Sequence, residues 1–108
     1  MSDSTVTNAE ILNNVAFDED GYMVDASAWN KEIAEAIAAQ LGLELTDRHW
    51  IVINFAREQY QATGEAPTLR KITKQSGVDT KELYQLFPGG AAKVVAKIAG
   101  LKKPTGCI

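Results

Sequence analysis

Glycine and proline interrupt this 108-residue chain at short intervals, and their spacing most constrains what it can fold into. Neither residue favours the continuation of a helix, so each interruption marks the end of a helical segment. The interruptions are Gly42, Gly64 with Pro67, Gly77, Pro88-Gly89-Gly90 and Gly100. The pattern predicts a mainly α fold, an orthogonal bundle of short helices with a helix-turn-helix-like core.

Apolar spacing predicts the first two helices. The first begins near Ser27, capped by Asp25 or Ser27, and ends at Gly42. Its apolar stripe has four-residue spacing and comprises Trp29, Ile33, Ile37 and Leu41. The second helix follows Thr46 and runs to about Ala62. Apolar residues cover much of its circumference, which predicts the most buried helix of the fold.

Three shorter helices are predicted in the second half. The third covers 69–75 after Thr68, and the fourth opens at Asp79, with Glu82 at the spacing of a capping box. The fifth runs from Ala91 to about Ala99. A short glycine turn joins the third and fourth helices, as in helix-turn-helix modules.

The N-terminal part is expected to hold a loose start over residues 1–14, followed by a small β-hairpin. Asp20-Gly21 lies between apolar residues, which is a strong hairpin signal and predicts strands near 14–17 and 22–24. We therefore expect one domain over residues 1–108, with a folded body at 15–100 and a mobile C-terminal arm at 101–108.

Composition narrows the class of protein. The chain is 45% apolar and 23% charged, which is ordinary for a globular protein, and no apolar run approaches the length of a membrane span. We see no signal peptide. The lone cysteine, Cys107, cannot form an internal disulfide, so the sequence favours a reducing compartment, most simply the cytoplasm.

Charge is divided unevenly along the chain. Residues 1–65 carry three basic and twelve acidic side chains, whereas residues 66–108 carry eight basic and two acidic ones. This division suggests that the C-terminal half meets an acidic partner, either protein or nucleic acid. The alternative is two solvated surfaces with no partner.

The tail offers the first candidate chemistry. Gly100, Pro104 and Gly106 are expected to keep the arm flexible, and Cys107 lies one residue from its end. A thiolate is the nucleophile in sulfur chemistry; Lys102 and Lys103 favour it and the terminal carboxylate opposes it. A thiol on a mobile arm suits the acceptance and transfer of a persulfide sulfur. The alternative is an incidental exposed cysteine.

Other motifs predict less. The exposed start of the fourth helix holds Asp79, Thr80, Lys81 and Glu82, a net negative set that suits phosphates poorly, so structural packing competes with DNA binding there. His49 is interpreted as a structural or surface histidine because one His and one distant Cys do not make a metal site. No cofactor or metal is predicted.

Two stretches, Leu83-Tyr-Gln-Leu-Phe-Pro-Gly-Gly-Ala-Ala-Lys93 and Lys97-Ile-Ala-Gly-Leu-Lys-Lys-Pro-Thr-Gly-Cys-Ile108, closely resemble the C-terminal signature of the DsrC/TusE sulfur-relay family. That family includes the gamma subunit of dissimilatory sulfite reductase and a relay protein of tRNA 2-thiouridine synthesis. Weaker pieces agree in order: Asp20-Gly21-Tyr22 with Trp29, Thr46 with His49-Trp50, and Pro67-Thr68-Leu69-Arg70.

The resemblance implies a small helical fold with an N-terminal hairpin and a flexible arm, in which Cys107 carries sulfur. The sulfite-reductase partners have a second cysteine eleven residues before the first, where this chain has Ala96. The 75–80 loop also looks short for the family. Both departures favour a one-cysteine carrier or a divergent regulatory relative.

We therefore hypothesise a sulfur carrier rather than a stand-alone enzyme. It would take sulfur from an upstream persulfide donor protein and pass it to an acceptor enzyme, either a tRNA thiolase or sulfite reductase. Four lysines would dock an acidic partner or stabilise the persulfide anion: Lys93, Lys97, Lys102 and Lys103. The alternative is a non-catalytic subunit or regulator of dissimilatory sulfite reductase, or a helix-turn-helix DNA-binding regulator.

Overall fold

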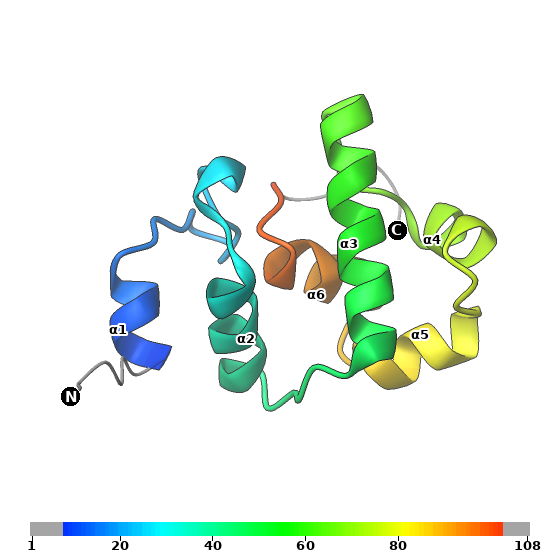
Figure 1. Cartoon of the computed structure of the whole chain (residues 1–108), viewed down its shortest axis with the longest axis horizontal. Helices are drawn as coiled ribbons and strands as arrows, with labels where there is room; N and C mark the ends of the chain where they lie inside the picture. The colour runs from blue at the N-terminus through cyan, green and yellow to red at the C-terminus, as the bar shows by residue number, and fades with distance from the viewer. Residues whose placement is uncertain (1–7, 103–108) are drawn as a thin grey trace.

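The computed structural model describes residues 8–102, and helices make up nearly all of their regular structure. In chain order the elements are α1 (Asn8–Asn13), the 3-10 turn η1 (Ala26–Ala28), α2 (Lys31–Gln40), α3 (Asp47–Thr63), α4 (Leu69–Gln75), α5 (Thr80–Leu86) and α6 (Ala91–Ile98). The predicted mainly α class is confirmed. Figure 1 shows α1 and α2 on one side, α4 and α5 on the other, and α6 between α2 and α3.

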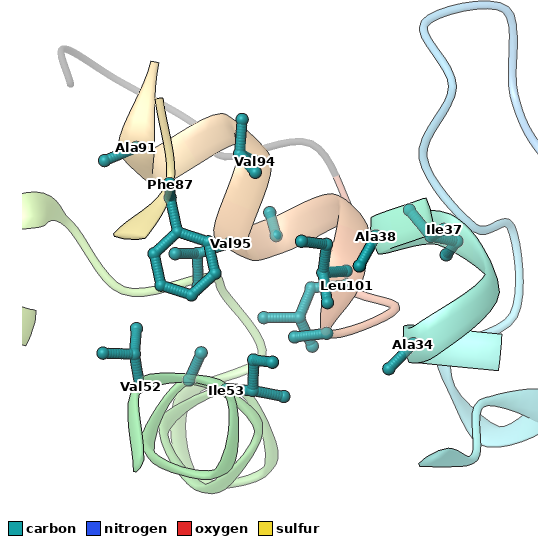
Figure 2. Packing of buried hydrophobic residues seen from close by; sticks show 14 of the residues in the cluster. Ala34, Ile37, Ala38, Val52, Ile53, Phe87, Ala91, Val94, Val95 and Leu101 are labelled. Carbon is teal, nitrogen blue, oxygen red and sulfur yellow. The ribbon is translucent and has the colours of Figure 1, made fainter. Parts of the chain in front are cut away.

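The most buried helix is α6, and the expectation that α3 would hold this place is wrong. Six of the eight α6 residues are buried, against four of the seventeen in α3, where Ile51 is 40% exposed. Figure 2 shows the apolar side chains that gather around α6. They are Ala34, Ile37 and Ala38 of α2, Val52 and Ile53 of α3, and Phe87 and Leu101. The core thus fixes the helix from which the C-terminal segment leaves.

The predicted hairpin is reduced to a tight turn with a single antiparallel bridge, between Phe17 and Met23, so the described residues contain no strands at 14–17 or 22–24. The Asp18 side chain closes the turn by accepting the N–H groups of Asp20 and Tyr22, at 2.9 and 3.0 Å. The ladder ends because Asp25 starts the turn η1 only two residues after the bridge.

The start of α2 lies later than predicted. Asp25 caps η1 instead, where its carboxylate accepts the Ser27 N–H at 3.0 Å. Trp29 is then extended, and Asn30 caps α2 by accepting the Ile33 N–H at 2.9 Å. Trp29 therefore precedes the helix rather than continuing its apolar stripe, and it is free to reach another element.

Part of the expected loose start is helical. Residues 8–13 form α1, which packs against α2 and buries Leu12 (Figure 1). Ile11 is partly buried beside it, so two consecutive apolar residues give this short helix an inner face.

The helix pair α4–α5 forms as predicted. Thr68 caps α4 by accepting the Lys71 N–H at 3.2 Å, and Asp79 caps α5 by accepting the Glu82 N–H at 2.8 Å. The second half of the expected capping box does not form, since Glu82 turns to α3 and accepts two hydrogen bonds from Arg48, each 2.7 Å long.

Candidate functional site

The predicted site residues fall into two groups. Cys107, Lys103, Pro104 and Gly106 lie outside the described residues. Gly100, Lys93, Lys97 and Lys102 are described, and they lie on α6 or directly after it. The site can therefore be built from the point at which the chain leaves α6.

Residues 98–101, here named the tail base, turn sharply out of α6 and remain in the body. Gly100 has φ +72°, a conformation that side-chain-bearing residues rarely adopt. The Leu101 N–H then donates to the Ala96 carbonyl at 2.9 Å, and Leu101 is fully buried. The body thus extends one residue beyond its predicted end, and Leu101 belongs to the core rather than to the arm.

Trp29 packs directly on the tail base. Its indole Nε1–H donates to the Ile98 carbonyl at 2.7 Å, across 69 positions of sequence. A Cβ atom added at Gly100 would lie 2.5–2.8 Å from three atoms of Trp29, closer than real contacts allow. The buried position of Gly100 against Trp29 favours a role in close packing over the flexibility that the sequence suggested.

Arg57 of α3 contacts both the tail base and Trp29. Its Nη1 donates to the Ala99 carbonyl at 2.6 Å and its Nη2 to the Ala26 carbonyl at 3.2 Å. The guanidinium carbon lies 4.1 Å from the centre of the Trp29 ring, within cation–π range. One half-buried side chain thus links η1, α3 and the tail base.

The chemistry of a helix end explains these partners. The last carbonyls of a helix lack intrahelical donors and carry partial negative charge, which a cation stabilises. Partial burial lowers the pKa of Arg57, although a guanidinium remains charged in proteins. Arg57 and Trp29 therefore satisfy two carbonyls that would otherwise face the interior unpaired.

Sequence reasoning missed Arg57 and gave Trp29 no role beyond the helix stripe and the family motif. A signal was available in the charge division, because Arg57 is one of only three basic residues among residues 1–65. Another of the three, Arg48, forms the ion pair with Glu82. A basic residue in such an acidic segment is therefore a candidate for a specific contact.

The three predicted site lysines that the structure describes, Lys93, Lys97 and Lys102, do not lie together in one site. Lys93 is exposed and lines a hollow of about 250 Å³ with Tyr84, Leu69 and residues 89–92. Lys97 is half-buried, with its Nζ 5.4 Å from the centre of the Tyr22 ring, and lines a separate hollow of about 340 Å³. Lys102 is exposed directly after the tail base.

His49 is buried and has a structural place. Its Nδ1 accepts the Thr46 N–H at 3.0 Å, which leaves Nε2 to donate to the Leu86 carbonyl at 2.8 Å. The ring also meets Phe87 edge-on, with centroids 5.0 Å apart. The histidine therefore ties the start of α3 to the end of α5. Among residues 8–102, no group of three or more His, Cys, Asp or Glu side chains is placed to hold a metal ion.

The start of α5, which would read bases in a DNA-binding module, keeps its acidic side chains occupied. Asp79 caps its own helix and Glu82 pairs with Arg48. The start of α5 carries one basic residue, Lys81, whereas α4 carries three, Arg70, Lys71 and Lys74. Within the described part of the chain, no helix is long and apolar enough to cross a membrane.

Comparison with known proteins identifies the class. The family model described as DsrC like protein matches residues 11–108. Sulfurtransferase TusE of Pectobacterium atrosepticum is 40% identical over an alignment 101 residues long, and the match covers 87% of this chain and 93% of that protein. These matches define a DsrC-like protein.

Solved structures agree with the sequence matches. The NMR structure of Allochromatium vinosum DsrC is 42% identical with a TM-score of 0.77, over 87% of this chain and 90% of that one. The crystal structure of the oxidized gamma-subunit of the dissimilatory sulfite reductase from Archaeoglobus fulgidus is 37% identical with a TM-score of 0.79, over 87% and 92%. The chain therefore belongs to the DsrC/TusE sulfur-relay family, as its C-terminal motif predicted.

Proposed function

We propose that this protein is a sulfur carrier that holds persulfide sulfur on Cys107. The observation that carries the proposal is that the family match runs to residue 108 and so includes the only cysteine of the chain. The likeness to a protein named sulfurtransferase TusE supports the same activity.

The transfer chemistry needs one thiol and no redox partner. The Cys107 thiolate attacks the outer sulfur of a donor persulfide, a bond forms between the two sulfurs, and the donor leaves as a thiolate. In delivery, an acceptor nucleophile attacks the outer sulfur, and the Cys107 thiolate leaves. Because each step exchanges one sulfur–sulfur bond for another bond to the outer sulfur, the carrier itself ends as it began. Ala96, where sulfite-reductase partners carry a second cysteine, does not enter this cycle.

The partners are a persulfide donor upstream and an acceptor enzyme downstream, either a tRNA thiolase or sulfite reductase, in the cytoplasm. Lys102 is exposed next to the tail base, and Lys93 lies at the other end of α6, so they would meet different parts of a partner surface. Contacts of exposed lysines are individually weak and screened by salt, so docking would be transient and salt-sensitive.

Intact-mass spectrometry after incubation with glutathione persulfide tests the carrier role. We expect a gain of one sulfur atom that a reductant removes and that is absent in Cys107→Ser. Sulfur retained by Cys107→Ser, or no gain in the wild-type protein, would contradict the proposal. A Lys93→Gln variant serves as the matched control, since loading from a small donor requires no docking.

A second candidate is a binding subunit of dissimilatory sulfite reductase, favoured by the likeness to the Archaeoglobus fulgidus gamma-subunit. It predicts a complex with sulfite reductase that forms equally well with Cys107→Ser. A complex that depends on Cys107, or none at all, would count against it.

A further inference from the structure

We propose that Trp29 and Arg57 are positioning residues that hold the tail base in one orientation and so fix the point from which Cys107 is presented. This inference deepens the proposed function and takes its purpose from it, but its test does not require sulfur transfer. Both residues act through residues 98–101, which they contact directly.

The contacts converge on three consecutive residues. Trp29 binds the Ile98 carbonyl at 2.7 Å, Arg57 binds the Ala99 carbonyl at 2.6 Å, and Gly100 lies against the indole with no room for a Cβ atom. The next residue, Leu101, is fully buried and bonds back to Ala96. These contacts thus hold the chain up to the last residue before the exposed Lys102.

Helix capping alone would not require this arrangement. Local turns or water can satisfy the carbonyls at an exposed helix end. Here both donors come from distant parts of the sequence, 69 and 42 positions away, and they also bind each other through the cation–π contact. Because these contacts join η1, α3 and α6, they constrain the direction in which the chain leaves α6 as well as pairing its last carbonyls.

The length of chain between the tail base and Cys107 explains why the contacts that hold the tail base affect the position of Cys107. Cys107 follows Leu101 by six residues, so it can reach about 20 Å from the anchor. If residues 98–101 detach, ten residues separate Cys107 from the body, and its effective concentration at a docked partner falls about twofold by length alone. Loss of a fixed starting direction adds to this effect.

The single cysteine makes the test direct. A nitroxide label on Cys107 of the full chain broadens the backbone amide NMR signals of whatever part of the body it approaches. We expect the broadening to cover one sector of the wild-type body and to spread over more of it in Trp29→Phe and Arg57→Gln. Amide exchange at Leu101, measured in the same samples, should accelerate about tenfold in both variants. Arg48→Gln, which removes an exposed guanidinium from the same helix, should leave both measurements unchanged.

The two measurements separate positioning from stability. Faster Leu101 exchange with an unchanged broadening pattern would overturn the proposal, because the pair would then only stabilise the helix end. Unchanged exchange and pattern would overturn it as well. If Arg57→Gln does not fold, the same measurements are made on Trp29→Phe, which keeps an aromatic ring, and on Arg57→Lys, which keeps the positive charge. The labelled protein carries no persulfide, so failure of sulfur loading would leave this result standing.

Discussion

The two arginines of α3 make different kinds of contact, Arg48 near the start of the helix and Arg57 in its second half. Arg48, in the first turn, forms a bidentate pair with Glu82 in which the two side chains are 47% and 31% exposed. Arg57, about two and a half turns later, is half-buried and donates to backbone carbonyls while it stacks on Trp29. The first contact depends on a titratable partner in water, whereas the second depends on none.

The difference indicates which of the two arginine contacts matters for the tail base. An exposed ion pair is screened and contributes little, so it joins α3 to α5 without fixing either helix strongly. Removal of the half-buried Arg57 guanidinium takes away the side-chain donor of the buried Ala99 carbonyl, which carries a desolvation penalty, whereas the Ala26 carbonyl keeps the Trp29 N–H at 3.3 Å. Arg57 is therefore expected to determine the geometry of the tail base, whereas the Arg48–Glu82 pair should tolerate substitution.

The largest expected effect comes from Gly100→Ala, which disturbs the packing of Trp29 on the tail base. The added Cβ would collide with Trp29 and require a strained positive φ, so we expect a loss of about 3 kcal/mol in the free energy of unfolding. Urea denaturation measures it. Gly42→Ala is the matched control, because its φ is +76° but no atom lies within 4 Å of the added Cβ; it should lose about 1 kcal/mol. Equal losses would mean that Trp29 does not press on Gly100.

Arg57→Met should follow, at about 2 kcal/mol in the same measurement. Methionine keeps the length and apolar stem but removes two charge-assisted hydrogen bonds and the cation–π contact. Arg48→Met, made in parallel, should be much milder. If the two variants lose equal stability, the contrast between the ends of α3 is wrong.

Trp29→Phe sharpens the comparison by removing one hydrogen bond and leaving a ring for Arg57. We expect a loss of about 1 kcal/mol, because the Ile98 carbonyl loses its donor while much of the packing remains. Thermal or urea unfolding measures this loss. A neutral substitution would show that water replaces the indole donor without cost.

The smallest expected effect is the pH dependence of the Arg48–Glu82 pair. The hydrogen bond from Arg48 lowers the pKa of Glu82 from its usual value of 4.5. A lowered folded-state pKa gives stability that is present above that usual value and is lost as the pH falls through the lowered one. The difference in melting temperature between wild type and Glu82→Gln should therefore shrink below about pH 4.5. The difference for Arg57→Met should persist in that window, since among residues 8–102 its contacts involve no carboxylate.

Local signals predicted the parts of the fold that local chemistry determines. Thr68 and Asp79 cap the helices that the sequence assigned to them, and Gly100 ends α6 as expected. The prediction of a hairpin was wrong because Asp25 caps η1 only two residues after the bridge, so the strands cannot extend further. The predicted early start of α2 was wrong because Asp25 caps η1, and α2 has a cap of its own at Asn30.

The site was harder to predict because its contacts are long-range. The tail motif named Cys107 and the family, and membership of that family is confirmed by the match over residues 11–108. No spacing rule could bring Trp29 and Arg57 to the end of α6, since each lies more than 40 positions from the carbonyl it binds there. The roles of the four lysines and of Cys107 stay predictions.

Whether Trp29 and Arg57 act as one unit on the tail base is tested most directly by a double-mutant cycle. We expect Trp29→Leu and Arg57→Met to be non-additive in urea denaturation, with a coupling of about 1 kcal/mol, because each removes the partner of the other. The pair Arg48→Met and Arg57→Met should be additive within about 0.5 kcal/mol. Additivity in both cycles would mean that the two side chains hold the tail base independently, which would contradict their action as one unit.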